Sequence, residues 1–484
     1  MLVSLYTSRV ILQTLGVDDY GTYQAVGGIV TMLSFVNSAL SGGTSRFLTF
    51  ELGTGDVGKL KRTFSTLLTL HILLAILIII VAETLGVWFV ANKLVIPEGR
   101  MEAAMFAYQM TVITSVFTLT QVPYGASIIS HEKMGVYAYL SIFETLAKLL
   151  IVYLLAISSW DKLKLFALLL CVLQIGTTLY YRFYCIRHFK ETRFSPIIDK
   201  DITKNVLGYS VWNLVSSISI PLKNQGLIIV LNVFFSPAVV TARAIANQVS
   251  MAANQFVQNF RTAVNPQIVK KYASGDRLGS KSLLLNSTKY SYYMMLLLCL
   301  PICLFAEPIL RLWLGEYPEY TVIFLRLTLV SSLFQVFDTS FYTALYAMGR
   351  IKENALISPV IGILIFPIIY LLFKLGYSPV SMAWVLLMFY AFLGLIVKPI
   401  LLVRFVGYTW KDIWSVFKPC FLVTIIAEPI PLYMTLQCTD PSILYFTSIL
   451  MVTLMVTTFS IYFGGIDKET RKKILSFIRT KIRR

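Results

Sequence analysis

The sequence predicts an all-α, polytopic integral membrane protein with about fourteen transmembrane helices. Its 484 residues are 57% hydrophobic and only 14% charged, and the mean hydropathy is +0.73. Apolar runs of roughly 18 residues or more recur from end to end, which is the length that crosses about 30 Å of hydrocarbon as a helix. Because lipid offers backbone polar groups no partners, such runs must be helical.

The apolar runs define the spans in chain order. The first is short, because only fifteen residues precede Gly16 and a helix rises only ~1.5 Å per residue. We therefore expect the native chain to begin further upstream. The predicted spans are residues 1–15, 22–42, 63–84, 104–128, 136–157, 165–185, 206–230, 238–264, 283–306, 322–347, 355–374, 380–403, 416–436 and 442–463.

Basic residues are distributed unevenly among the loops. Of the 42 Lys and Arg residues, 28 lie in one set of alternating connections and 6 in the other, with the remainder inside spans. Basic loops stay in the cytoplasm, so both termini are predicted to be cytoplasmic. This bias explains the net charge of +18 without a nucleic-acid partner.

Short similar segments indicate an internal repeat. The segment from Ala82 resembles the segment from Ala306, and Ile151–Leu155 resembles Ile368–Leu372. The nearly constant offset predicts two homologous lobes in the same orientation. The predicted domains are a six-helix lobe at 1–200 with a truncated first helix, a six-helix lobe at 201–410, two added helices at 411–465 and a basic amphipathic cytoplasmic tail at 466–484.

The eighth span carries an unusual stripe of polar residues. At 100° per residue these side chains fall within an arc of roughly 80° and extend over about 33 Å. Facing lipid, one arginine near the centre would cost roughly 2.5 kcal/mol or more. The stripe therefore faces either a water-filled conduit, which we favour, or another helix held by amide hydrogen bonds. It consists of Arg243, Asn247, Ser250, Asn254, Gln258, Arg261 and Asn265.

Further basic and polar residues accompany this stripe. Asn213 and Lys223 lie in the seventh span, and Arg9 and Arg46 bracket the first two spans. Arginine suits bidentate phosphate binding, so these cations favour an anionic, sugar-bearing cargo. For Lys223 and Arg9, anchoring at the membrane interface is an equal alternative.

Two intramembrane carboxylates are candidates for ion coupling. Glu144 and Lys148 have the spacing of a helical ion pair, so mutual neutralisation is the alternative to a coupling role for Glu144. Asp338 is a lone carboxylate in the tenth span, and hydrogen bonding to its neighbours is the alternative there.

Loop lengths and composition argue against an enzyme. Every predicted extracytoplasmic loop is short, about fifteen residues at most, which favours moving a substrate over transforming it. The three histidines are scattered, so we predict no metal site, cofactor or catalytic site. The basic tail predicts contact with anionic inner-membrane lipids.

Four segments carry a resemblance to a known family. They are YTSRVILQTLGVDDYGTY (6–23), SGGTSRFLTFELGTGD (41–56), GYSVWNLVSSISIPLKNQG (208–226) and ARAIANQVSMAANQFVQNFRTAVNPQIVKKYASGD (242–276). The chain resembles Wzx-type polysaccharide flippases of the MATE-like MOP exporter superfamily, particularly those of Bacteroidetes type.

The resemblance implies two six-helix lobes in a V around a cationic cavity in the bacterial inner membrane, with two extra C-terminal helices. Its implied cargo is an undecaprenyl-pyrophosphate-linked oligosaccharide for lipopolysaccharide O-antigen or capsule, moved by alternating access. Glycan polymerase and glycosyltransferases are implied partners. A cation-coupled MATE-like drug antiporter is the first alternative, and a membrane-bound glycan-processing enzyme the second.

Overall fold

The computed structural model describes residues 2–32, 35–206, 225–348, 351–437, 443–467 and 471–472. Regular structure within these ranges is entirely helical. The candidates Asn213 and Lys223, and most of the predicted amphipathic tail, lie outside the described residues. The prediction of an all-α polytopic membrane protein is confirmed.

Helices cover nearly all of the predicted spans. They are α1 Leu2–Leu15, α2 Val17–Met32, α3 Phe35–Thr54, α4 Val57–Val81, α5 Val87–Asn92, α6 Met101–Ser130, α7 Met134–Ile157, α8 Lys162–His188, α11 Leu227–Phe234, α12 Pro237–Ala273, α13 Arg277–Leu304, α14 Ala306–Leu314, α15 Thr321–Ala347, α16 Ile351–Lys374, α17 Val380–Phe392, α18 Lys398–Leu401, α19 Trp410–Ala427, α20 Pro429–Leu436 and α21 Ile443–Ser460.

Hydropathy and length alone identify fewer spans than predicted. Among the described residues, nine helical segments are long and apolar enough to cross a membrane, or ten if α13 and α14, which meet at 79°, count as one span. α1 is too short at 14 residues, and the polar stripe makes α12 too hydrophilic. The count of fourteen therefore stays a prediction.

The chain divides into two compact units, Met1–Ala244 with Pro359–Pro379 and Ile245–Ser358 with Val380–Arg484. Two of the three boundaries fall inside helices, α12 and α16, and the third directly precedes α17. The predicted lobe boundary near residue 200 stays a prediction, since residues 207–224 lie outside the described part.

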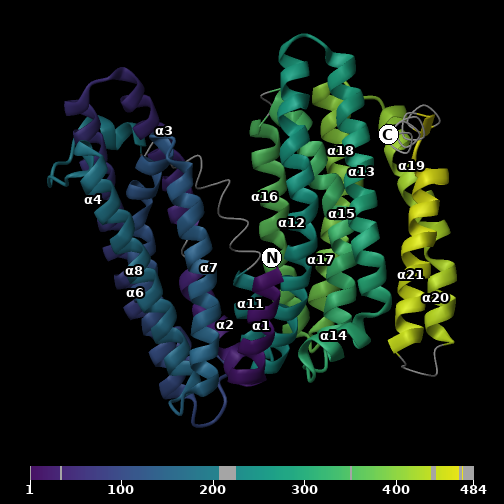
Figure 1. The fold of residues 1–484 in the computed structure, drawn as a ribbon, viewed down its shortest axis with the longest axis horizontal. Helices are drawn as coiled ribbons and strands as arrows, with labels where there is room; N and C mark the ends of the chain where they lie inside the picture. Colours follow the sequence, from purple (N-terminus) through teal and green to yellow (C-terminus); the bar gives the residue numbers. More distant parts are fainter. Residues whose placement is uncertain are drawn as a thin grey trace, which may run out of the picture. The chain divides into compact units, whose positions relative to one another are not determined.

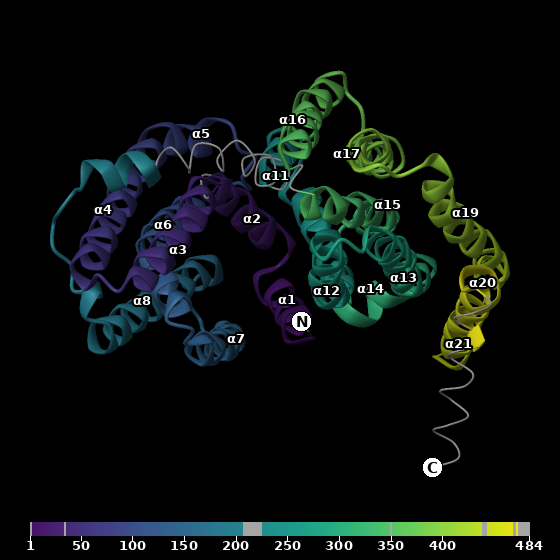
Figure 2. The same ribbon diagram turned by 90° about the horizontal axis from the view of Figure 1, so that it is seen from above.

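Unit 1 is built around α6 and α8, which pack along each other with α3 and α4 beside α6 (Figures 1 and 2). A π-helical turn, Ala82–Gly86, joins α4 to α5. The buried Tyr108 hydroxyl donates to the Ala82 carbonyl at 2.8 Å. A Cβ at Gly86 would lie 1.9 Å from that hydroxyl, so only glycine permits this contact.

The start of α12 is fixed within unit 1. The Thr241 hydroxyl donates to the Val17 carbonyl at 2.7 Å, and the Asn232 amide bonds both backbone groups of Val95. These contacts tie α11 and the first turns of α12 to α2 and to the connection that precedes α6.

Unit 2 is built around α13, α15 and α17, with α19 and α21 packed against α13. Its core includes an aromatic cluster in which the Phe337 ring lies 5.1 Å from that of Tyr292 and 5.0 Å from that of Phe417.

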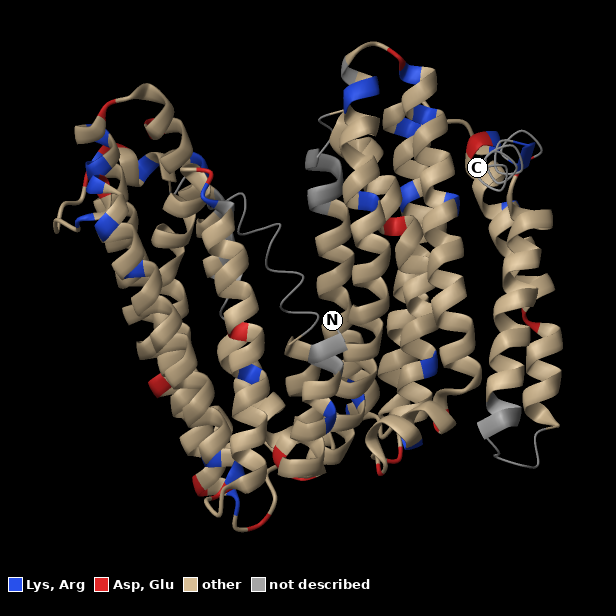
Figure 3. Cartoon of the chain, viewed as in Figure 1, with Lys and Arg blue, Asp and Glu red and all other residues tan. Residues whose placement is uncertain are grey.

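Figure 3 shows that charged residues gather at the ends of the helices, with few along their middles. The charges that do lie mid-helix therefore need partners or water.

Candidate functional site

The polar stripe of α12 makes hydrogen bonds to α15 at successive turns. Ser250 and Ser332 join their hydroxyls at 2.8 Å, and the Asn254 amide donates to Ser332 at 3.2 Å. Further along, the Arg261 guanidinium donates to the Thr339 carbonyl and, at 3.3 Å, to the Thr343 hydroxyl. This part of the stripe is thus a polar interface between two helices of unit 2, the alternative considered for it above.

A second polar face on α12 is open instead. Gln255, Gln258 and Asn259 are exposed, and the Gln255 amide donates to Asn259 at 3.0 Å. Of the stripe residues named from the sequence, only Gln258 belongs to this exposed face, while Asn247 and Asn254 are half-buried. Amides exposed within a membrane span are tolerated where they line water or a polar ligand.

The predicted cationic residues occupy different environments. Arg243 and Arg261 are buried, with exposed fractions of 9% and 7%. Arg46 is exposed, and Arg9 is half-buried. Arg9 makes no hydrogen bond or ion pair within the part of the chain that the structure describes. Two of the four described cations are therefore accessible to solvent, and two are buried in the protein.

A cavity of about 190 Å³ lies among α2, α6, α7 and α8 of unit 1. Glu144 and Lys148 both line it, together with Tyr23, Thr111, Thr114, Gln174 and Thr177. Although the two charges have helical ion-pair spacing, they do not approach within 4 Å of each other among the described contacts. The cavity is large enough to hold water beside both charges.

Asp338 has a partner that sequence inspection missed. Its carboxylate lies 3.1 Å from the ammonium of Lys398, an ion pair that lacks hydrogen-bond geometry. Lys398 is 2% exposed and also donates to the Ser358 hydroxyl at 3.1 Å. The only signal in the sequence was an unexplained base inside the twelfth span.

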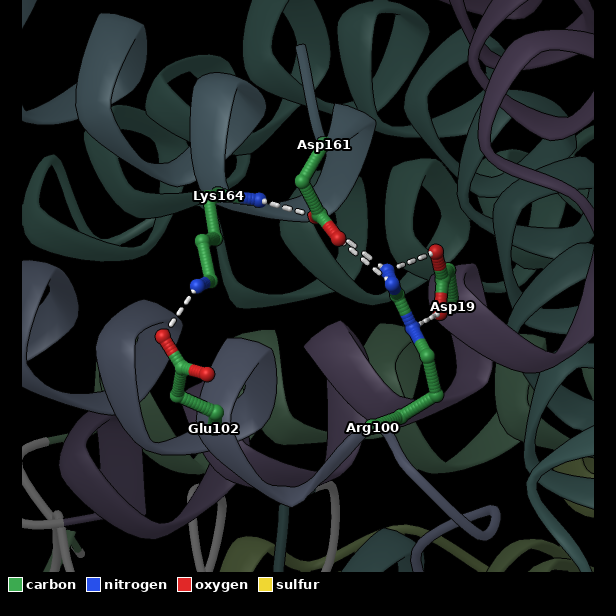
Figure 4. A network of polar contacts seen from close by, with 5 residues as sticks. All are labelled: Asp19, Arg100, Glu102, Asp161 and Lys164. Atoms are coloured by element: carbon green, nitrogen blue, oxygen red, sulfur yellow. Dashed lines mark hydrogen bonds and ion pairs between the residues drawn. The ribbon is translucent and has the colours of Figure 1, made fainter.

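A network of charged groups joins the N-terminal ends of α2, α6 and α8 in unit 1 (Figure 4). Arg100 pairs with Asp19 and with Asp161, each at 2.5 Å, and Lys164 pairs with Glu102 at 2.5 Å. Burial alone would raise the pKa of Asp161, but hydrogen bonds from Arg100 and from the Lys164 backbone hold it below the ordinary value. This network fixes the first turn of α2 to the ends of α6 and α8.

The fold is that of the MurJ and MATE transporters, a multi-pass helical membrane architecture. The chain is similar to the lipid II flippase MurJ in an inward closed conformation, with a TM-score of 0.71, 14% identity and 95% of each chain covered. It is similar to an inward-facing multidrug resistance MATE family transporter of the MOP superfamily, with a TM-score of 0.69, 14% identity, and 84% of this chain and 94% of that chain covered.

Sequence comparison adds one curated relative. The uncharacterized membrane protein EpsK of Bacillus subtilis (strain 168) is 21% identical over 381 residues, which cover 75% of this chain and 72% of that protein. No family model matches the chain. These similarities define the class of fold.

Proposed function

We propose that the chain is a flippase that moves an undecaprenyl-pyrophosphate-linked oligosaccharide from the cytoplasmic to the outer leaflet of the bacterial inner membrane by alternating access. The observation that carries the proposal is the exposed amide face of α12, formed by Gln255, Gln258 and Asn259. This face lies about 6–12 Å from the middle of the predicted span, at 1.5 Å per residue. Amides at that depth suit a path for sugar hydroxyls.

Basic side chains account for binding of the pyrophosphate group of the cargo. We assign the pyrophosphate to the accessible bases Arg9 and Arg46, and to Lys223, Arg243 and Arg261 as further candidates. One arginine guanidinium can bind two phosphate oxygens at once, and it keeps its charge at every physiological pH. The similarity in fold to MurJ, a lipid II flippase, supports a lipid-linked cargo.

We further propose that two lobes of six helices, with two added helices, rock about the cargo path, and that both termini face the cytoplasm. The glycan serves O-antigen or capsule synthesis, and the partners are inner-membrane lipids, glycosyltransferases and a glycan polymerase.

Two observations weigh against a cation-coupled drug antiporter. A site for a cationic drug needs an available carboxylate, whereas Asp338 is paired with Lys398. The unit 1 cavity that holds Glu144, at about 190 Å³, is smaller than the roughly 300–1,000 Å³ of drug-sized pockets.

Complementation in a strain that lacks its own flippase tests the proposal. The variant that combines Gln255→Ala, Gln258→Ala and Asn259→Ala should lose most glycan export at unchanged protein level. Gln437→Ala, which removes an exposed amide from the residue that follows α20, is the matched control and should export normally. Normal export by the triple variant would remove the observation on which the proposal rests.

A further inference from the structure

Charged side chains from three helices lie in the interior of unit 2. Asp338 of α15 pairs with Lys398 at the start of α18, and Arg261 of α12 donates to the carbonyl of Thr339, the residue that follows Asp338. Arg261 and Lys398 are 7% and 2% exposed, and the Asp338 side chain is 17% exposed. A buried ammonium is tolerated only where oxygen or aromatic groups replace its water.

The surroundings of the Lys398 ammonium have the composition of a cation site. Asp338 places a carboxylate oxygen at 3.1 Å and Ser358 a hydroxyl at 3.1 Å, while the Tyr342 ring centre lies at 5.6 Å. Carboxylate and hydroxyl oxygens are ligands of hard monovalent and divalent cations, and an aromatic face also attracts a cation. The carboxylate, the hydroxyl and the aromatic ring come from α15 and α16, and the ammonium that they surround comes from α18.

The backbone geometry that delivers Lys398 is also specialised. π-helical turns at Leu393–Val397 and Leu402–Val406 flank α18 on both sides, and such turns are frequent at functional sites. A Cβ at Gly394 would lie 2.6 Å from the Phe334 carbonyl of α15, so glycine allows the two helices to touch there. One turn further along each helix, Lys398 meets Asp338.

We propose that unit 2 contains a monovalent-cation site whose permanent occupant is the protein's own Lys398 ammonium. Asp338 therefore takes no Na⁺ or K⁺ in the intact protein, and Lys398 performs the charge compensation that a bound ion would otherwise provide. The inference concerns ion use and rests on the proposed transport function. Its test measures binding, so it succeeds or fails independently of glycan export.

Removal of the ammonium should leave a vacant site. Lys398→Ala keeps Asp338, Ser358 and Tyr342 while it opens space for an external ion. Purified protein in nanodiscs is heated in NaCl, KCl, methylammonium chloride or choline chloride at constant ionic strength. The melting temperature of Lys398→Ala should rise saturably with at least one of the three small cations relative to choline.

Two further proteins make the result decisive. The double variant Lys398→Ala with Asp338→Asn should lose this cation-specific rise in melting temperature. The unsubstituted protein should show no rise in melting temperature that depends on Asp338. Absence of a rise in folded Lys398→Ala would overturn the proposal. If Lys398→Ala does not fold, radioactive Na⁺ binding to the unsubstituted protein decides: binding abolished by Asp338→Asn contradicts the proposal, and binding unaffected by Asp338→Asn, or absent, supports it.

Discussion

Arg261 offers a quantitative test of how α12 is held to α15. Its guanidinium donates to the Thr339 carbonyl and to the Thr343 hydroxyl. Hydrogen bonds from charged donors contribute roughly 1.5–3 kcal/mol each, but withdrawing the charge from water offsets several kcal/mol of this gain. A double-mutant cycle between Arg261→Met and Thr343→Val separates the free energy of the Arg261–Thr343 interaction from the cost of burying the guanidinium charge.

We expect a coupling free energy of unfolding of about 1 kcal/mol for this pair. That value exceeds the average of roughly 0.6 kcal/mol for interhelical pairs in membranes, because the donor carries a charge. Reversible unfolding of the purified protein in mixed micelles supplies the four free energies. The matched control replaces Thr343→Val with Thr453→Val, which removes another buried hydroxyl, from α21.

The control cycle should be additive within about 0.3–0.5 kcal/mol. If the Arg261–Thr343 cycle is additive to the same degree, the polar stripe does not hold the two helices together. Arg261 would then be available for cargo in the way that the sequence suggested.

Three other perturbations test separate parts of the structure. Gly86→Ala should destabilise the protein by about 1–3 kcal/mol through overpacking against the Tyr108 hydroxyl, and Tyr108→Phe should relieve part of this loss in thermal unfolding. Because the folded pKa of Asp161 is lowered from 3.8, its stabilising contribution is present above that pH and is lost as the pH falls through the folded value; Arg100→Gln should flatten this acid dependence in a melting-temperature series. Glu144→Gln should make glycan export insensitive to collapse of the ion gradient if Glu144 is the coupling group, and an unchanged response would exclude it.

Sequence periodicity predicted the helices and the class of protein well, because a span needs only length and hydrophobicity. It was less accurate where backbone geometry intervenes. It did not predict the 79° bend between α13 and α14, which lies at the end of the predicted span 283–306.

The site shows which pairings a sequence can and cannot reveal. Helical spacing correctly placed Ser250, Asn254 and Arg261 on one face, yet it did not show that α15 would occupy that face. The local rule that predicts an ion pair between Glu144 and Lys148 does not describe the structure, in which both side chains line the unit 1 cavity. Asp338 meets a lysine sixty positions away, and only the packing of α15 against α17 and α18 brings the two together.

The central claim is that the exposed amide face of α12 passes the sugars of a lipid-linked cargo across the membrane. Its most direct test is translocation of an undecaprenyl-pyrophosphate-linked oligosaccharide by the purified protein in proteoliposomes, measured as accessibility of the labelled glycan to an external enzyme. We predict that the unsubstituted protein and Gln437→Ala accelerate translocation, and that the combined Gln255→Ala, Gln258→Ala and Asn259→Ala variant does not. Equal acceleration by the triple variant, or none by the unsubstituted protein, would contradict the claim.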